Sequence, residues 1–206
     1  ACIAAFAKND NEINERFNFG EILFLRERIE DAIKRIKDPF AVGFSCYVWN
    51  MEYNKALAKK IKELYPSCVI VFGGHNIPYD TSVLKENDFI DILIHGEGEV
   101  CFTELLKGLD KGDISDVSDI SYRRENEFVT TKRSDGCFSL ENYPSPYLTG
   151  IFDSMYKEYP LIDFQATLET NRGCPYQCAF CDWCFTEKIR YFPMEKIKAE
   201  IKWMSE

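Results

Sequence analysis

Three cysteines near the C-terminal end of the sequence have the spacing of a metal-binding loop. Cys174, Cys178 and Cys181 form the pattern CxxxCxxC, between an extended apolar run and a segment with helical periodicity. Thiolates at this spacing can converge on one metal centre, and sulfur ligands suit iron–sulfur clusters, zinc and copper. Three ligands leave one iron of a four-iron cluster open to a substrate. The sequence therefore predicts a metal centre in this loop.

Two other uses of these cysteines compete with a cluster. Cys178, Cys181 and Cys184 form two overlapping CxxC pairs, from which zinc sites are built. A structural zinc site normally takes its second ligand pair from a distant segment, and neither His75 nor His95 has metal-site spacing. A thioredoxin-like redox pair would begin a helix after a βαβ opening and needs no third cysteine. The cluster is favoured over zinc and over redox-active or inert thiols. Cys184 is either a bystander or a zinc ligand, and the bystander role is favoured.

Strands that alternate with helices precede the loop. Continuous apolar runs of strand length occur at residues 40–48, 68–72 and 91–94, and helices are expected at 53–65 and 100–109. The first of these runs is of the kind that is buried on both faces of a parallel sheet. This alternation predicts an α/β fold, a doubly wound (flavodoxin- or Rossmann-like) parallel sheet with right-handed crossovers.

The segment before the first of these strands predicts three further elements. Residues 1–7 are small and apolar and indicate the end of a helix. Residues 12–17 alternate polar and apolar side chains, as a strand does. Apolar side chains between residues 22 and 36 recur at steps of three and four, which predicts an amphipathic helix that ends before Pro39.

Three loops are expected to leave the sheet at the carboxyl ends of its strands, where ligands of such sheets bind. Glycines there let the backbone approach a large flat ligand, and the following helix starts offer free N–H groups. Each loop taken alone also has a structural explanation, because glycines turn chains and acidic residues stabilise helix starts by about 0.3–1 kcal/mol. The candidate cofactor-binding residues on these loops are Ser45, Trp49, Asn50, Gly73, Gly74, His75, Glu97, Gly98 and Glu99.

The sequence changes character after residue 118. Residues 119–124 and 127–131 predict a β-hairpin appended to the sheet. Residues 134–160 carry prolines, glycines and tyrosines without a sustained period and indicate an ordered connector. Residues 161–168 predict a strand and residues 193–204 a helix, which together with the cysteine loop form the first βα unit of a truncated (β/α) barrel.

These motifs resemble those of a known family. The CxxxCxxC loop, with Phe180 before its third cysteine, looks like the cluster loop of radical S-adenosylmethionine (SAM) enzymes. The strand ends GFSCYVWN, VFGGH and HGEGE look like the cobalamin-binding domain that precedes this loop in one branch of the family. The resemblance implies a 4Fe-4S cluster on Cys174, Cys178 and Cys181, S-adenosylmethionine on the fourth iron, and cobalamin. Phe180 would pack near the adenosyl group or belong to the core.

The same resemblance implies a domain organisation. A cobalamin-binding Rossmann-like domain, lacking its first strand, would occupy residues 1–133, and a connector would occupy residues 134–160. Residues 161–206 would be the N-terminal fragment of the radical SAM domain. Because a barrel cannot close from one βα unit, we expect this polypeptide to be a fragment of a longer parent protein, without turnover on its own.

For the parent protein, the resemblance implies methyl transfer to an unreactive carbon or phosphorus centre. A deoxyadenosyl radical would abstract hydrogen from a small-molecule substrate, and methylcobalamin would donate the methyl group. Ring-forming chemistry occurs in the same branch, and an external electron donor such as a flavodoxin or ferredoxin is implied. A non-catalytic corrinoid-binding or zinc-binding module is the alternative from another class.

One signature of corrinoid proteins is missing. In the motif DxHxxG a histidine replaces the lower cobalt ligand, and the aspartate orients that histidine. Here residues 95–98 read HxxG, but Leu93 takes the place of the aspartate, so the imidazole lacks this partner. We therefore expect cobalamin to bind without a protein histidine on cobalt. His75 would contact the corrin edge or form a hydrogen bond within its own turn.

Composition narrows the partners and the compartment. A chain of 206 residues with 46% hydrophobic and 15% aromatic residues can build a real core. A net charge of −9 without a basic patch argues against nucleic acid. We expect neither a membrane span nor a signal peptide. Nine cysteines, clustered at 174–184 and otherwise scattered through strand-like segments, indicate reduced thiols in the cytoplasm.

Overall fold

The computed structural model describes residues 1–134, 138–176, 178–181 and 188–205. The chain divides into two compact units. One unit consists of Arg16–Arg133, and the other combines Ala1–Glu15 with Ser134–Glu206. No helix in the described ranges has both the length and the apolar character that crossing a membrane requires.

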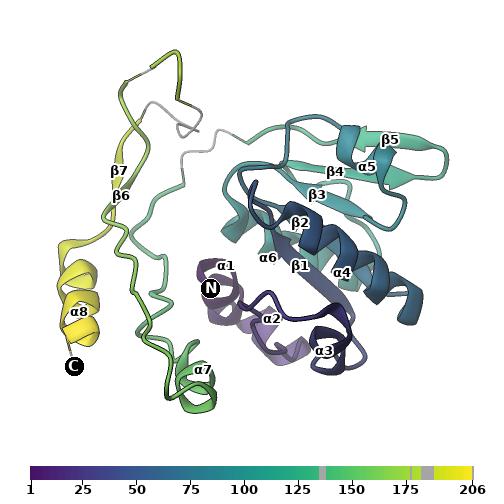
Figure 1. The fold of residues 1–206 in the computed structure, drawn as a ribbon. Coiled ribbons are helices and arrows are strands. Elements are labelled where there is room, and N and C mark those ends of the chain that lie inside the picture. Colours follow the sequence, from purple (N-terminus) through teal and green to yellow (C-terminus); the bar gives the residue numbers. More distant parts are fainter. Residues whose placement is uncertain (135–137, 177, 182–187, 206) are drawn as a thin grey trace. The chain divides into compact units, whose positions relative to one another are not determined.

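The first unit is built on a five-stranded mixed sheet (Figure 1). The strands are β1 (Ala41–Ser45), β2 (Val69–Gly73), β3 (Ile92–Ile94), β4 (Ile120–Arg124) and β5 (Glu127–Thr130), and they lie in that order across the sheet. The first three strands are parallel, while β4 and β5 form an antiparallel hairpin beside β3. The predicted α/β sheet with an appended hairpin is confirmed.

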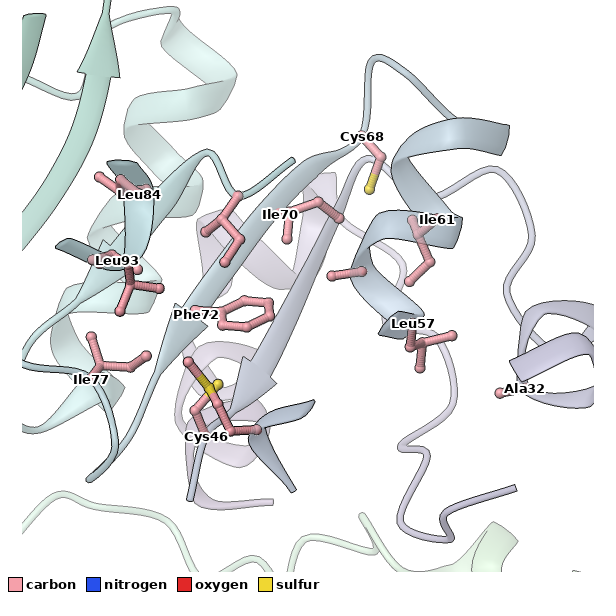
Figure 2. Packing of buried hydrophobic residues seen from close by; sticks show 14 residues of the cluster. Ala32, Cys46, Leu57, Ile61, Cys68, Ile70, Phe72, Ile77, Leu84 and Leu93 are labelled. Carbon is pink, nitrogen blue, oxygen red and sulfur yellow. The ribbon is translucent and has the colours of Figure 1, made fainter. Parts of the chain in front are cut away.

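Helices cover both faces of this sheet. On one face α4 (Met51–Leu64) and α5 (Ser82–Glu86) pack on alternate strand residues such as Phe72 and Leu93, as Figure 2 shows, and α3 (Ile29–Lys34) packs against α4. On the other face α6 (Gly98–Lys111) packs against the intervening residues Val71, Ile92 and Ile94. This alternation is the two-residue period of a strand that is buried on both sides. Each fully buried large aliphatic or aromatic side chain stabilises the fold by about 1.5–3 kcal/mol.

The first strand is less buried than its sequence predicts. We expected residues 40–48 to be buried on both faces, and this expectation is wrong for β1. Its side chains are half-buried or exposed, and Gly43 and Ser45 are exposed. Among the described residues β1 pairs with β2 alone, so it forms an edge of the sheet, where burial is smaller than in the centre.

The strand expected in the N-terminal segment is also wrong. The predicted strand at residues 12–17 is instead helix α2 (Asn11–Arg16), which follows α1 (Cys2–Asn9). The Asp10 carboxylate accepts a hydrogen bond of 3.1 Å from the Ile13 N–H, which is an N-cap contact that favours a helix.

The amphipathic helix expected between residues 22 and 36 is helical only in α3. Residues 17–28 are irregular, and the guanidinium of Arg35 forms ion pairs with Glu21 and Glu27 of this segment. Ile22 and Leu25 are 37% and 36% exposed, so they do not belong to a buried helical stripe. The apolar spacing between residues 22 and 36 is therefore longer than the helix, because only its C-terminal part forms α3.

The second unit contains α7 (Asp153–Glu158), β6 (Asn171–Arg172), β7 (Arg190–Tyr191) and α8 (Met194–Ser205). The helix expected at residues 193–204 is confirmed as α8, but residues 161–168 are irregular, so the predicted strand there is wrong. The Tyr147 hydroxyl donates a hydrogen bond to the Thr167 carbonyl at 2.7 Å and accepts one from the Thr167 N–H at 3.0 Å. A side chain thus satisfies backbone groups that a neighbouring strand would otherwise pair.

Candidate functional site

The carboxyl ends of the three parallel strands lie in one row. Ser45 of β1 is the register partner of Gly73 of β2, and Gly73 is in turn the partner of Ile94 of β3. The loops that follow, residues 45–50, 73–78 and 95–99, therefore start side by side at one edge of the sheet. This is the edge at which open α/β sheets bind their ligands.

Gly74 lets the first two loops approach each other closely. Its φ is +109°, and a Cβ there would lie 2.8 Å from the Cys46 oxygen and 3.0 Å from the Cys46 nitrogen. The two loops are also joined by backbone hydrogen bonds, from the Cys46 N–H to the Gly73 carbonyl at 2.6 Å and from the Asn76 N–H to the Cys46 carbonyl at 3.0 Å. Only glycine combines this backbone conformation with this spacing.

Two asparagines hold the loop after β1. The side-chain amides of Asn50 and Asn54 both donate to the Ser45 carbonyl, at 2.9 and 3.0 Å. The Asn50 side-chain oxygen accepts from the Tyr47 N–H at 2.8 Å. Two candidate residues therefore shape the loop: the Ser45 carbonyl accepts both amide hydrogen bonds, and the Asn50 side chain spans from this carbonyl to the Tyr47 N–H.

The same loop presents an aromatic surface. The Trp49 side chain is 64% exposed and stacks on Tyr47, with ring centroids 4.7 Å apart and ring planes at 6°. The His75 ring of the neighbouring loop lies 6.0 Å from Tyr47, centroid to centroid. Tyr47 was not among the residues predicted from the sequence, although an aromatic residue two positions from Trp49 at a strand end was the available signal.

His95, by contrast, faces the interior of the sheet edge. The residue is 3% exposed, and its Nε2 shares a hydrogen bond of 2.8 Å with the Ser121 hydroxyl. The Ser121 hydroxyl in turn contacts the Thr130 hydroxyl at 2.8 Å, which links the loop to both strands of the hairpin. Burial lowers the pKa of His95 below its usual value, which favours the neutral ring.

Tyr79 covers His95. The centroid of its ring lies 5.3 Å from that of the His95 imidazole, on which it stacks. The Arg133 guanidinium lies over the Tyr79 ring, 4.0 Å from its centroid. Gly96 has φ +71°, and a Cβ there would lie 2.9 Å from the Tyr79 hydroxyl. Sequence reasoning missed Tyr79, whose only signal was its place just after the Gly73–Pro78 loop.

Glu97, Gly98 and Glu99 form the start of α6. Glu97 is the N-cap residue and Gly98 is the first residue of the helix. Glu99 lies in the first turn and is 5% exposed, and its carbonyl accepts a hydrogen bond from the Thr103 hydroxyl at 2.9 Å. Acidic groups in the first turn of a helix are favoured by its dipole, so a structural explanation of Glu99 stands beside its predicted contact with a cofactor.

The cysteine loop is closed at its base by a short antiparallel ladder. Asn171 pairs with Tyr191 and Arg172 pairs with Arg190, so β6 and β7 join the two ends of residues 173–189. The thiol-bearing residue Cys174 is half-buried, whereas Cys178 and Cys181 are exposed. Cys184 lies outside the described residues.

Within the ranges that the structure describes, no three histidine, cysteine or acidic side chains lie in a metal-binding arrangement. The donor set itself fits a soft metal, because three thiols stand within eight residues of one loop and two of them are exposed. Phe180 is 93% exposed within the described residues. Its two expected uses, packing near the adenosyl group and packing in the core, both stay predictions.

Comparison with known proteins shows the family to which the chain belongs. The family model of the B12 binding domain matches residues 2–106. The chain is 36% identical, over 98% of its length, to TokK, a cobalamin-dependent radical SAM methyltransferase of Streptomyces tokunonensis. It is 34% identical, over 99% of its length, to the 2-(S-pantetheinyl)-carbapenam-3-carboxylate methyltransferase of Streptantibioticus cattleyicolor. The chain spans 31% of each of these two relatives.

A solved structure shares the fold. The radical S-adenosylmethionine methyltransferase TsrM of Kitasatospora setae, determined with cobalamin and a [4Fe-4S] cluster, superposes with a TM-score of 0.66 at 14% identity. The match covers 97% of this chain and 42% of TsrM. The first unit thus has an α/β fold with a mixed, mainly parallel sheet. The chain belongs to the B12-binding domain family, in the branch that resembles cobalamin-dependent radical SAM proteins.

Proposed function

We propose that this chain is the cobalamin-binding part, with the cluster loop, of a radical S-adenosylmethionine enzyme that transfers methyl groups. The observation that carries the proposal is the row of three loops at the carboxyl edge of a sheet whose sequence matches the B12-binding family. Cobalamin would supply a transferable methyl group, and the cluster with S-adenosylmethionine would supply one-electron chemistry. The following residues would hold these groups.

The cobalamin contacts are proposed at the loops after β1 and β2. Trp49 and Tyr47 offer an exposed stacked aromatic surface against which a flat macrocycle can pack. Gly74 keeps the two loops close together, and its neighbour His75 lies beside Tyr47 at the same edge. Burial of apolar surface and close backbone approach would therefore supply most of the affinity.

The absence of a protein ligand on cobalt is part of the proposal. The Nε2 of His95 is engaged by Ser121, and the ring is buried beneath Tyr79. The other ring nitrogen, Nδ1, has no hydrogen-bond partner among the described residues, but it is buried as well, so neither nitrogen can reach a metal without movement of the side chains that cover the ring. We therefore propose that cobalamin binds without histidine coordination, which the missing aspartate at Leu93 also indicates.

In the second unit, Cys174, Cys178 and Cys181 are proposed as ligands of the 4Fe-4S cluster. The exposed thiols of Cys178 and Cys181 are accessible to iron, and Gly173, with φ +90°, turns the chain immediately before Cys174. The exposed ring of Phe180 is available to pack on the adenosyl group of S-adenosylmethionine. Cys184 is proposed as a bystander.

The substrate is proposed to be a small molecule, and an electron donor such as a flavodoxin or ferredoxin would reduce the cluster in the cytoplasm. The similarity to TokK and to the carbapenam methyltransferase favours methyl transfer over ring formation. Activity is proposed for the parent protein, because the chain spans 31% of these relatives.

Anaerobic reconstitution with ferrous iron and sulfide tests the cluster. We expect about four irons per chain and a brown colour, since each cubane cluster holds four irons. Serine in place of Cys174, Cys178 or Cys181 should abolish iron uptake, while Cys184→Ser, the matched control, should leave it unchanged. A colourless chain that binds one zinc and no iron would instead support a zinc-binding module.

A further inference from the structure

We propose that Arg172 is a positioning residue that locks the base of the cysteine loop, through a positive charge held between two aromatic rings. This inference rests on the proposed cluster, because its purpose would be to fix the direction in which the ligand Cys174 leaves the β6–β7 ladder. Arg172 touches neither cluster nor substrate in this account. It acts through the rings and strands described below.

The guanidinium of Arg172 is enclosed by its surroundings. Its central carbon lies 5.4 Å from the Tyr143 ring centroid and 5.7 Å from that of Phe192, and these two rings meet edge to face at 6.4 Å. The Glu169 carboxylate accepts hydrogen bonds from Nε and Nη2 of Arg172 at 3.2 and 3.1 Å. The Arg172 side chain is 13% exposed, so its charge interacts with rings and carboxylate in a partly desolvated setting.

The rings that enclose Arg172 come from segments on both sides of the loop. Tyr143 and Phe192 are 7% and 6% exposed, and Tyr143 also packs against Phe6 at 4.8 Å. Phe192 follows β7 directly, and its N–H donates to the Thr170 carbonyl at 3.1 Å, immediately before β6. Arg172 on β6 thus clamps a ring at the end of β7, across the two ends of the loop.

A second cation contacts the same ring. The Lys196 ammonium lies 4.0 Å from the Phe192 centroid and 3.8 Å from the Glu200 carboxylate within α8. Glu200 is 4% exposed. Phe192 therefore contacts a cation from β6 and a cation from α8, so the ladder that closes the loop is tied to the helix that follows it.

The clamp matters because the ladder is short. Two residue pairs join β6 to β7, and an isolated two-stranded hairpin is at best marginally stable in water. Gly173, with φ +90°, then separates the clamped Arg172 from Cys174 by one residue. If the base opens, the first thiol loses its fixed direction relative to the other two.

The experiment compares the wild-type chain with Arg172→Met, Arg172→Lys and Glu169→Gln. Arg124→Met, an exposed arginine of β4, is the control. The first measurement is amide hydrogen exchange at Phe192 and in β6 and β7 of the metal-free chain. The second is iron retained after anaerobic reconstitution and gel filtration. Far-UV circular dichroism and hydroxocobalamin affinity check that each variant is folded.

We expect Arg172→Met to speed exchange at the base of the loop and to lower retained iron severalfold, with unchanged cobalamin affinity. Arg172→Lys should restore most of both, because lysine keeps the charge against the rings, and Glu169→Gln should fall between. The proposal is overturned if the methionine variant matches wild type, or if lysine is as defective as methionine. If the wild-type chain takes up no iron, the proposed cluster fails, while the exchange data still decide whether Arg172 closes the loop.

Discussion

Replacing Gly74 by alanine should test the close approach of the first two loops at the sheet edge. A methyl group at this position would lie 2.8 Å from the Cys46 oxygen and 3.0 Å from the Cys46 nitrogen, both of them backbone atoms. The backbone must also keep φ near +109°, a region that residues with a Cβ rarely adopt. The loops must therefore separate, or the chain must carry the strain.

The expected cost follows from these two terms. Strained backbone at one residue costs about 1–3 kcal/mol, and forcing an extra methyl group into a packed region costs about 1–3 kcal/mol more. We expect Gly74→Ala to lower the free energy of unfolding by about 2–6 kcal/mol. Gly112, at the end of α6, is a matched control, since it has φ +79° but no atom within 4 Å of a Cβ. Gly112→Ala should cost only the backbone strain of about 1–2 kcal/mol.

Urea unfolding followed by circular dichroism measures both free energies, and titration with hydroxocobalamin measures the effect on binding. Gly74→Ala should weaken cobalamin binding, because the two loops that carry Trp49 and His75 move apart. Gly112→Ala should leave the affinity unchanged, since this residue lies at the far end of α6. The reasoning is refuted if Gly74→Ala costs no more stability than Gly112→Ala and binds cobalamin equally well.

Three further predictions concern single side chains. Burial raises the pKa of Cys46 to about 11 and that of Cys101 to about 12. At pH 8 iodoacetamide should therefore modify the exposed Cys178 long before either of them, which mass spectrometry of the folded chain can follow. Equal rates of modification would contradict the described packing. The pKa of His95 in the folded chain lies below the unfolded value of 6.5, so the unfolded chain binds more protons as the pH falls. The free energy of unfolding should therefore decrease as the pH drops below about 6.5. Urea midpoints should show this loss in the wild type and a smaller loss in His95→Gln. Trp49→Ala should change stability by less than about 0.5 kcal/mol, since the ring is 64% exposed, yet weaken cobalamin binding in the same titration; unchanged affinity would remove Trp49 from the site.

The sequence was sufficient for the parts of the fold in which local pattern and tertiary packing agree. The strands at 68–72 and 91–94 and the helices at 53–65 and 100–109 occur as α/β alternation predicts, within a few residues of the expected bounds. These segments carry apolar residues that the fold does bury, so periodicity and packing give the same answer. The edge at which three loops meet follows from the parallel order of the strands.

The two wrong strand predictions have different physical causes. Residues 12–17 alternate as a strand does, but the Asp10 cap starts a helix there, and six residues are too few for periodicity to distinguish the two. Residues 161–168 are apolar enough for a strand, yet Leu161 is 96% exposed, and among the described residues no strand pairs with this segment. A strand depends on a partner that its own sequence cannot reveal.

The candidate site shows the same division. The glycine-rich loop was predicted, and Gly74 has a definite steric reason. Tyr47 and Tyr79 were missed because their roles depend on rings contributed by other residues, Trp49 in one case and His95 in the other. Ser121 and Thr130, which fix His95 from the hairpin, also could not be linked to it by spacing.

The most direct test of the central claim is a titration of the purified chain with hydroxocobalamin, followed by absorption and by equilibrium dialysis. We predict saturable binding of one cobalamin per chain, with a cobalt spectrum that His95→Gln and His75→Gln leave unchanged and an affinity that Gly74→Ala reduces. A well-folded chain that binds no cobalamin, or a bound spectrum that changes when either histidine is replaced, would contradict the account.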